Sequence, residues 1–586
     1  MKEALFLSSS SLYQECFVAD RFRDDAKLQA AATRYLYRMG SRATPFGVLA
    51  GLSIGSFGER NDLQVGNLDQ ARRFCRLDQG IVQQHIDAAK QQVLDAPALN
   101  AGLMVSLNNS AWNAPDGVRF ISSSATHGTI AYRLTRARRT AATDAVLTAL
   151  AEGPMIASDL NAILCDRLKA GPERVGGFLA SLAHNQLLKV DPEVFVTGDE
   201  SGSDVVTELA ESPLDQSTKS LANAHSVLQR ISSDPKANIE VYKRVADEVH
   251  AASADEGSKV DMARVVHVDL HKEGANPVLS RKTVDVIANE LWSVRSLLVH
   301  QRDDLNQFAT AFSSRFGDRA VPLLQALDDD YGVAFGSRSQ VPQPLIDGFP
   351  FAKRSDRTAI IRPSDLMIMT KLERALRMGD EEIVIDAHDL ETLDNENLDF
   401  PSSFATMGIF HAESPQALAA DQFTFEPTAT HAPSGARLLS RFCVGSSELQ
   451  SRVRDQIEAF EGNHPDAIVA EFAHLPEGRV GNVVLRPVLR EYELPYLGRS
   501  GAPENKQIKL TDLFVSVRDG IVTLRSLSLG KEIIPRITTA HNYSNPTNLP
   551  LYQFMGALER QHEPAVGFSW PASVQNLRYL PKVRSG

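Results

Sequence analysis

The 586-residue chain is too long to fold around one hydrophobic core, and its length predicts three or four domains. Hydrophobic residues make up 43% of the chain and charged residues 23%, which is typical of a soluble globular protein, and no apolar run reaches the ~18–20 residues of a membrane span. A net charge of −12, from 73 acidic and 61 basic residues, excludes general nucleic-acid binding but leaves room for one local basic site.

Export and metal chemistry are both disfavoured by sequence features. The first ten residues mix an acid with a base and have no apolar secretory core, so a cytoplasmic protein is predicted. Four scattered cysteines without a CxxC pair indicate reduced, structural thiols and no zinc. Phosphate-loop, dinucleotide-binding, HExxH and GxSxG motifs are absent from the sequence, so we predict no bound metal or cofactor.

A basic stripe followed by a Gly/Pro turn is the first predicted element. The pattern predicts a helix over residues 26–39 that ends at Gly40, a tight turn from Thr44 to Gly47, and strands in the Gly-rich passage 46–58. Three arginines recur every four residues and would share one helix face: Arg34, Arg38 and Arg42. This arrangement suits an anionic ligand held near a hydroxyl; the alternative is a solvated arginine face on an ordinary helix.

Hairpins and a winged helix are predicted next. Short alternating runs over residues 103–137 indicate antiparallel hairpins, and residues 141–196 read as three helices followed by strands at 187–190 and 194–196. The third helix carries one arginine, Arg174, whereas a protein that reads the major groove usually brings several cationic or amide side chains. We therefore predict a winged helix that binds peptide, by strand addition along the edge of its wing.

The rest of the chain completes an α+β fold. A mostly helical segment includes a strand from Val265 to Leu270 and an amphipathic helix from Lys282 to His300, and strands alternate with short helices after it. We predict several subdomains with mixed and antiparallel sheets, packed helices and the inserted winged helix. The expected units are 1–140, 141–196, 197–355 and 356–586.

Several strings, in the right order, resemble one known family. The C-terminal strings are Leu475 to Gly498, Leu524-Arg525-Ser526, Lys531 to Arg536 and Ala540 to Tyr543. Together with Arg38-x-x-x-Arg42-x-Thr44-Pro-Phe-Gly and Arg76-Leu-Asp78, they resemble the class I lanthipeptide (lantibiotic) dehydratases in their N-terminal glutamylation domain. The resemblance extends across nearly the whole chain.

The resemblance implies a function that composition does not reveal. Such domains take glutamyl-tRNA and transfer the glutamyl group to Ser or Thr hydroxyls of a ribosomally made precursor peptide, whose leader the winged helix holds. A separate elimination-domain protein is the expected partner, because the elimination domain is not in this sequence. The chain is thus expected to be the glutamylation half of a split dehydratase, or part of a longer one, and a homodimer is a further expectation.

The residue types and the resemblance together select candidate site residues. The predicted catalytic set is Arg38, Arg42, Thr44, Asp78 and His541. The predicted substrate- and tRNA-binding set is Arg34, Asn482, Arg486, Arg490, Arg525, Arg536 and Asn542. Arginines suit phosphates and a developing oxyanion, and arginines from the two ends of the chain, Arg42 and Arg486 among them, should converge on one cleft.

Each of these assignments has a structural alternative. Asp78 has the spacing of a helix N-cap ahead of Ile81, and His541 could cap a turn rather than act as a general base. The C-terminal arginines compete with roles in structural ion pairs.

Two other functions stay open at the level of sequence. A related ligase would use ATP to add an amino acid from aminoacyl-tRNA to the C-terminus of a scaffold peptide. A non-catalytic relative would only bind the leader peptide for partner enzymes.

Overall fold

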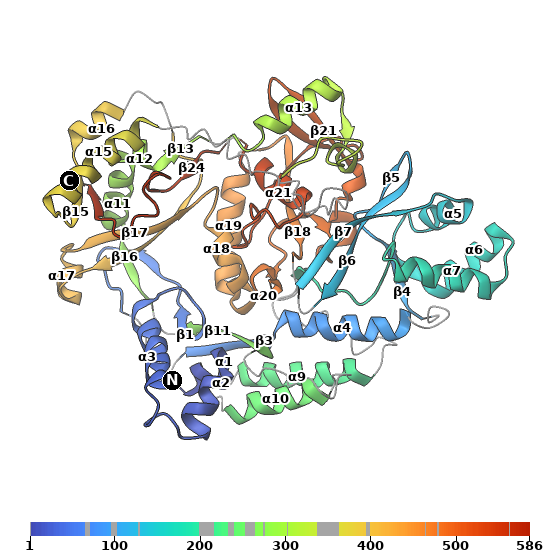
Figure 1. Ribbon diagram of the computed structural model, residues 1–586, viewed down its shortest axis with the longest axis horizontal. Coiled ribbons are helices and arrows are strands. Elements are labelled where there is room, and N and C mark those ends of the chain that lie inside the picture. Colours follow the sequence, from blue (N-terminus) through green and yellow to red (C-terminus); the bar gives the residue numbers. More distant parts are fainter. Residues whose placement is uncertain are drawn as a thin grey trace, which may run out of the picture.

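A three-stranded sheet near the N-terminus organises the first lobe (Figure 1). The computed structural model describes residues 2–64, 71–94, 102–126, 129–198, 216–232, 239–251, 264–272, 276–301, 303–336, 362–393, 399–462, 464–476, 480–561 and 563–585. The sheet has the order β1 (Gly47–Leu52), β11 (Val266–Lys272) and β3 (Ala71–Leu77). β1 is parallel and β3 antiparallel to β11. The central strand therefore comes from the predicted third unit, so this sheet joins residues of the predicted first and third units.

Helix α3 (Ala26–Ser41) carries the arginine stripe and begins at a capped N-terminus. The side chain of Asp25 accepts hydrogen bonds from the backbone N–H groups of Lys27 and Leu28, which satisfies two free donors of the first turn. The helix continues through Gly40, so the predicted stop there is wrong. Arg42 lies at the C-cap with an extended backbone (φ −116°, ψ 113°), and the regular stripe therefore ends at Arg38.

Helices cover one face of the first sheet and build its core. Cys75 and Leu77 of β3, with Val266 and Val268 of β11, point into this core. Three of the covering helices lie side by side in Figure 1: α4 (Gln79–Leu94), α9 (Gln216–Ser232) and α10 (Ile239–Ala251). The N-terminal segments pack in the same core and comprise α1 (Lys2–Ser8), α2 (Ser10–Tyr13) and the π-helix η1 (Gln14–Val18). A short parallel pair, β2 (Ser56–Gly58) with β12 (Val278–Ser280), extends the lobe.

The predicted hairpins and the three helices of the winged helix are present. The strands β5 (Trp112–Ala114), β6 (Gly117–Thr126) and β7 (Thr129–Ala137) form an antiparallel sheet. The helices are α5 (Ala141–Ala149), which Thr140 caps, α6 (Ala157–Leu168) and α7 (Pro172–His184). Leu160, Leu164 and Leu179 are fully buried between these helices.

The wing differs from the predicted hairpin. Strand β9 (Leu188–Val190) pairs with β4 (Met104–Leu107), which in turn pairs with β8 (Met155–Ile156). Residues 194–196 do not pair with β9; Phe195 instead forms a bridge with Arg499. This strand pairs with a segment more than 80 residues earlier in the chain, and no local sequence pattern encodes such a pairing.

A six-stranded mixed sheet forms the core of the C-terminal half. Its order is β14 (Val321–Pro322), β21 (Leu513–Arg518), β22 (Ile521–Ser526), β23 (Glu532–Arg536), β18 (Ala467–His474) and β20 (Tyr492–Tyr496). β18 is parallel to both β20 and β23, and the other pairs are antiparallel.

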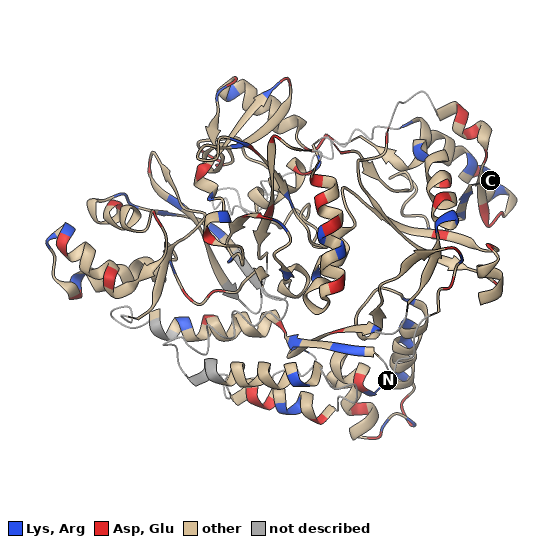
Figure 2. Cartoon of the chain, turned by 180° about the vertical axis from the view of Figure 1, so that it is seen from behind, with Lys and Arg blue, Asp and Glu red and all other residues tan. Residues whose placement is uncertain are grey.

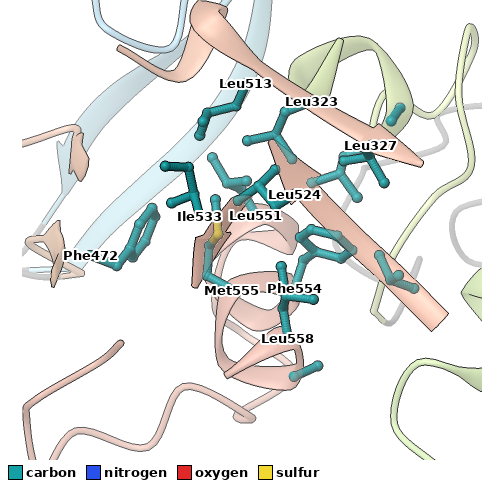
Figure 3. Close-up of a cluster of buried hydrophobic side chains, with 14 of the residues drawn as sticks. Leu323, Leu327, Phe472, Leu513, Leu524, Ile533, Leu551, Phe554, Met555 and Leu558 are labelled. Carbon is teal, nitrogen blue, oxygen red and sulfur yellow. The ribbon is translucent and has the colours of Figure 1, made fainter. Parts of the chain in front are cut away.

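Helix α21 (Pro550–Leu558) packs against this sheet, and all its residues after Pro550 are buried. Figure 3 shows Leu551, Phe554 and Met555 of the helix pointing into a cluster of apolar side chains from the strands. Helices α13 (Asn306–Phe316) and α14 (Leu323–Ala326) contribute to the same core. A helix that is apolar on nearly all sides is stable in a globular protein only where it is buried, as α21 is here.

His474, at the end of β18, makes the stability of this core sensitive to pH. Its Nδ1–H donates to the carbonyl oxygen of Tyr496 at 2.9 Å, its ring contacts the ring of Tyr552, and burial lowers the pKa of His474 to about 4. The unfolded chain, with an ordinary histidine pKa near 6.5, takes up the proton first as the pH falls. The contribution of His474 to the unfolding free energy is therefore fully present above pH ~6.5. It is lost as the pH falls towards 4, and the loss is on the order of 3 kcal/mol.

We expect a His474→Gln variant to lose less unfolding free energy than the native protein between pH 7 and pH 4. Urea denaturation at a series of pH values measures the difference, and substitution of the exposed His388 serves as the control. Parallel curves for His474→Gln and the native protein would contradict this account.

A fourth lobe combines the segment after β12 with the C-terminal residues. Its helices are α11 (Arg281–Ser293), α12 (Arg295–Leu298), α15 (Pro363–Met378), α16 (Ala387–Leu393) and α17 (Pro415–Ala419). Its strands pair as β13 (Val299–His300) with β24 (Ala565–Val566), β15 (Glu382–Ile385) with β25 (Lys582–Ser585), and β16 (Ala405–His411) with β17 (Thr424–His431). The predicted helix 282–300 is thus broken at Val294 and ends in a strand.

The predicted boundary between residues 355 and 356 lies outside the described residues. Among the described helices, none is long and apolar enough to cross a membrane. The α+β class with mixed and antiparallel sheets is confirmed.

Candidate functional site

Strand β11 presents three polar side chains on the face of the first sheet opposite the core. Side chains alternate between the two faces along a strand. Val266, Val268 and Leu270 therefore point to the face that carries the core, and His267, Asp269 and His271 point to the opposite face. On β3, Arg76 lies opposite His267 and Arg72 lies opposite His271. The result is a polar face with two arginines, two histidines and one carboxylate.

Asp269 is the buried acidic group at the centre of this face. Its side chain is 3% exposed, and its Oδ2 lies 3.3 Å from Nε2 of His267. Burial alone would raise the pKa of Asp269, but His267, Arg76 and Arg441 outweigh it and hold the pKa well below the usual range. Burial, followed by the charge of Arg76, lowers the pKa of His267. Asp269 is therefore ionised at neutral pH.

Arg441 joins the C-terminal half of the chain to the predicted Thr44–Gly47 turn. It belongs to the 3-10 helix η5 (Ser440–Gly445), and its Nη2 donates to the carbonyl oxygen of Pro45 at 3.2 Å. Gly47, which ends the turn, is the register partner of Asp269 on the neighbouring strand. Arg441 consequently contacts the turn, and Asp269, on the central strand, lies beside the end of the turn. Gly47 has φ +54°, a left-handed conformation that favours glycine.

Arg38 lies beside the same turn. Its guanidinium stacks over the ring of Phe46, 4.6 Å from the ring centre, and its Nε is buried with no hydrogen-bond partner among the described residues. Arg34, Arg42 and Thr44 are exposed. Figure 2 shows basic residues in blue along both α3 and β3. These positions leave Arg34, Arg38, Arg42 and Thr44 available to a ligand, and their predicted roles stay predictions.

Asp78 has the contacts of the helix N-cap predicted as its structural alternative, and its predicted catalytic role stays a prediction. One carboxylate oxygen accepts from the backbone N–H of Gly80 at 2.9 Å, at the start of α4, and the other accepts from Nδ2 of Asn482 at 2.9 Å. The Oδ1 of Asn482 in turn accepts from Nη1 of Arg76 at 2.9 Å. Asp78 therefore caps the helix and also orients Arg76 through Asn482, which is buried.

Arg486 and Arg490 have structural partners, which corrects their predicted role in binding tRNA. The Arg486 side chain is 1% exposed and donates from Nε to Glu471 at 3.1 Å and from Nη1 to the carbonyl oxygen of Val484 at 2.6 Å. Arg490 binds Glu471 and donates from Nε to Glu461 at 2.6 Å. Side chains that are buried and paired offer no surface to a nucleic acid, so Arg486 cannot share a cleft with the exposed Arg42.

Arg536 is also buried, and Arg525 is exposed. Nη1 of Arg536 donates to the carbonyl oxygen of Glu559 at 2.9 Å, and its guanidinium lies 5.3 Å from the ring centre of Phe460. We therefore assign Arg536 a structural role in place of the predicted substrate contact. Arg525 donates to the carbonyl oxygen of Gly530 at 2.6 Å across a hairpin.

His541 and Asn542 lie in a turn before α21. Nδ1 of His541 is 3.1 Å from the hydroxyl of Tyr552, the two rings stack, and burial lowers the pKa of His541. Asn542 Oδ1 accepts from the backbone N–H of Ser544 at 3.1 Å, as in an Asx turn. Both contacts favour the structural alternative, and the predicted general base at His541 stays a prediction.

Sequence reasoning missed Arg441, Asp269 and His267. A signal for Asp269 was present, because a carboxylate within the apolar strand 265–270 must be buried with partners. No such signal marks Arg441, because its partner Pro45 is 396 residues away in sequence.

A cavity of about 1070 Å³ lies elsewhere, between α13 and α21. Its lining includes Asp303, Arg315, Tyr543 and Gln553 but none of the predicted site residues. No group of three or more potential metal ligands occurs within the described ranges.

Fold and site define a large α+β protein with an arginine-rich polar face and a winged-helix unit. The chain matches the family described as "Lantibiotic dehydratase, N terminus" over residues 1–586 and belongs to that family. A curated relative, the epidermin biosynthesis protein EpiB of Staphylococcus epidermidis, is 29% identical over 80 residues, which cover 13% of this chain and 8% of that protein.

Solved structures share the fold. The tRNA-dependent lantibiotic dehydratase MibB from Microbispora sp. 107891 is similar with a TM-score of 0.75 and 24% identity, covering 100% of this chain and 56% of MibB. The glutamylation domain of TbtB, from thiomuracin biosynthesis, has a TM-score of 0.60 and 16% identity, covering 99% of this chain and 70% of TbtB. A TbtB structure bound to 5'-phosphodesmethylglutamycin has a TM-score of 0.60 and 18% identity, over 97% of this chain and 70% of TbtB. This chain thus spans about half the length of MibB.

Proposed function

We propose that the chain transfers the glutamyl group of glutamyl-tRNA to Ser or Thr hydroxyls of a ribosomally made precursor peptide. Family membership over residues 1–586 supports the proposal, as do the descriptions of MibB as tRNA-dependent and of TbtB as a glutamylation domain. The observation that carries it is that Arg441 contacts the Thr44–Gly47 turn and that Asp269 is the register partner of Gly47 at the end of this turn, beside the exposed arginines of α3.

The charges at this edge suit both parts of an aminoacyl-tRNA. Exposed guanidiniums of Arg34 and Arg42 fit the phosphates near the acceptor end. Attack by a hydroxyl on the glutamyl ester places negative charge on the carbonyl oxygen, which Arg38 or Arg441 would stabilise. The peptide hydroxyl loses its proton, and the tRNA ribose oxygen takes one up as the ester bond breaks. Asp269, ionised and buried, would position Arg441 and Arg76.

The precursor peptide would bind at the winged helix. Strand β9 is an edge strand of the β8-β4-β9 sheet, so a leader peptide could add to it as a further strand. Dehydration would then need a separate elimination-domain protein to expel glutamate. A cytoplasmic location, where charged tRNA is available, belongs to the same proposal, and homodimer formation stays a prediction.

Mass spectrometry of a reconstituted reaction tests the proposal. Purified chain, glutamyl-tRNA and the cognate precursor should yield peptide that is heavier by one or more glutamyl units, attached to Ser or Thr. Omission of the tRNA should leave the peptide unmodified, with or without ATP and free glutamate.

Two outcomes would contradict it. An unmodified peptide in the presence of folded chain and intact glutamyl-tRNA would leave a peptide-binding role only. Addition at the peptide C-terminus with consumption of ATP would indicate the ligase instead.

A further inference from the structure

We propose that Tyr37 and Phe46 form an aromatic platform on which the unpaired 3′-terminal nucleotides of the tRNA stack. The inference deepens the proposed function and rests on it, because it takes tRNA as the ligand of the α3 surface. It assigns a binding role to two side chains that carry no charge and no reactive group.

The side chain of Tyr37 lies on the solvent-exposed face of α3. Leu28, Ala31 and Tyr35 pack against the core of the first lobe, and Tyr37 lies on the opposite side of the helix, given 100° per residue. Its side chain is 75% exposed and makes no hydrogen bond or ring contact with any residue that the structure describes. Tyr37 therefore contributes nothing to the core that would explain a large aromatic side chain here.

Phe46 is exposed and held in place. It is 47% exposed on the Thr44–Gly47 turn, with the guanidinium of Arg38 over its ring at 4.6 Å. The backbone N–H of Phe46 donates to the carbonyl oxygen of Ala50 at 3.1 Å, which fixes the turn. A ring held by a cation on one side is preorganised to receive a further planar group beside it.

The charge around these rings selects a polyanion over a protein partner. Residues 26–58 contain four basic side chains and no acidic one, in a chain whose net charge is −12. Arg34 lies one turn before Tyr37 and Arg38 directly after it. Basic side chains that alternate with exposed aromatic rings are the means by which proteins hold single-stranded nucleic acid, since phosphates and bases are bound together.

The 3′ end is the part of a tRNA that fits this surface. Its terminal nucleotides are unpaired, so their base faces are free to stack, whereas the bases of the acceptor stem are already stacked in a duplex. Phe46 belongs to the turn that contacts Arg441 and that ends at Gly47, the register partner of Asp269, where the glutamyl ester at the end of those nucleotides would react.

Binding of two tRNAs to three variants tests the inference. The probes are uncharged tRNA for glutamate and the same tRNA without its unpaired 3′ nucleotides, measured by fluorescence anisotropy at fixed salt. Tyr37→Ala should weaken binding of the intact tRNA by about 5- to 150-fold, the range for loss of one stacked base, and should leave the truncated tRNA unaffected. Tyr37→Trp should retain or strengthen binding of the intact tRNA.

A matched control and the opposing outcomes make the test specific. Tyr579→Ala removes another exposed tyrosine, which is 53% exposed and lies in the fourth lobe. This variant should bind both the intact and the truncated tRNA with the native affinity. Equal affinities of Tyr37→Ala and native protein for intact tRNA would overturn the platform while leaving the proposed function standing. Binding of neither tRNA to native protein would instead reject the proposed function itself. If sedimentation shows that Tyr37→Ala separates a native dimer and tRNA affinity is unchanged, the surface is a contact between two copies, and the platform is rejected.

Discussion

Replacement of Arg38 and Arg42 together by alanine is expected to abolish glutamyl transfer and to leave leader-peptide binding intact. Arg38 lies beside the turn that meets Arg441 and Asp269, and Arg42 is exposed at the end of α3. Loss of one donor to a developing oxyanion, here Arg38, typically costs about 10²–10³ in kcat. Loss of the phosphate contact of Arg42 should weaken tRNA binding as well, so the two changes together should bring transfer below detection. Single-turnover assays with glutamyl-tRNA measure the transfer, and anisotropy of a labelled leader peptide measures the binding.

The control for this double variant preserves the charge. With both residues replaced by lysine, tRNA affinity should be partly retained while the rate stays low, because lysine cannot make the paired contacts of a guanidinium. Arg452→Ala removes an arginine that already pairs with Glu448 on the surface, and it should leave the rate unchanged. Transfer by the double alanine variant at the native rate would show that these arginines do not serve the reaction.

Replacement of Glu471 by alanine is expected to be the most destabilising single change in the C-terminal half. The carboxylate is fully buried on β18, an interior strand of the six-stranded sheet, and it pairs with both Arg486 and Arg490. Burial alone would raise the pKa of Glu471, but these two arginines hold it below the usual value. Its removal leaves two buried cations without their shared partner, which typically costs about 3–5 kcal/mol.

Urea denaturation followed by circular dichroism measures this loss against an exposed pair. Glu448→Ala breaks an ion pair with Arg452 in which both side chains are more than half exposed, and it should cost less than about 1 kcal/mol. Similar midpoints for Glu471→Ala and Glu448→Ala would show that the buried pair does not hold the sheet together. Glu471→Gln, which keeps the shape of the side chain, should fall between the two.

The fold was predictable where local pattern suffices. The helix that begins at residue 26, the strand from Val265 to Leu270 and the three helices of the winged helix were all predicted from the spacing of apolar residues and from turn residues. The predictions of secondary structure were wrong where a segment pairs with a strand that is distant in sequence. The wing pairs with β4 instead of with residues 194–196, and the amphipathic stretch 282–300 breaks at Val294 to supply a strand that pairs with β24.

The candidate site divides in the same way. Arg38, Thr44 and Asp78 were predicted from short strings. In the structure Arg38 stacks on Phe46 of the turn that contains Thr44, and Asp78 accepts a hydrogen bond from Asn482, while their functional roles stay predictions. Arg486 was predicted as a tRNA-binding residue in the same way. The sequence shows that it is a cation but does not show that Glu471, 15 residues earlier on β18, already binds it.

The amino-acid sequence by itself determined the family, the α+β class and the exposed basic helix, because these depend on residue type, order and short-range spacing. Only the tertiary structure decided which arginines are free and which are paired. Pairing depends on contacts such as that between Arg441 and Pro45, which are 396 residues apart, and on burial, which is a property of the whole fold. Those contacts leave the α3 arginines open to a ligand and hold the arginines of the C-terminal core in ion pairs.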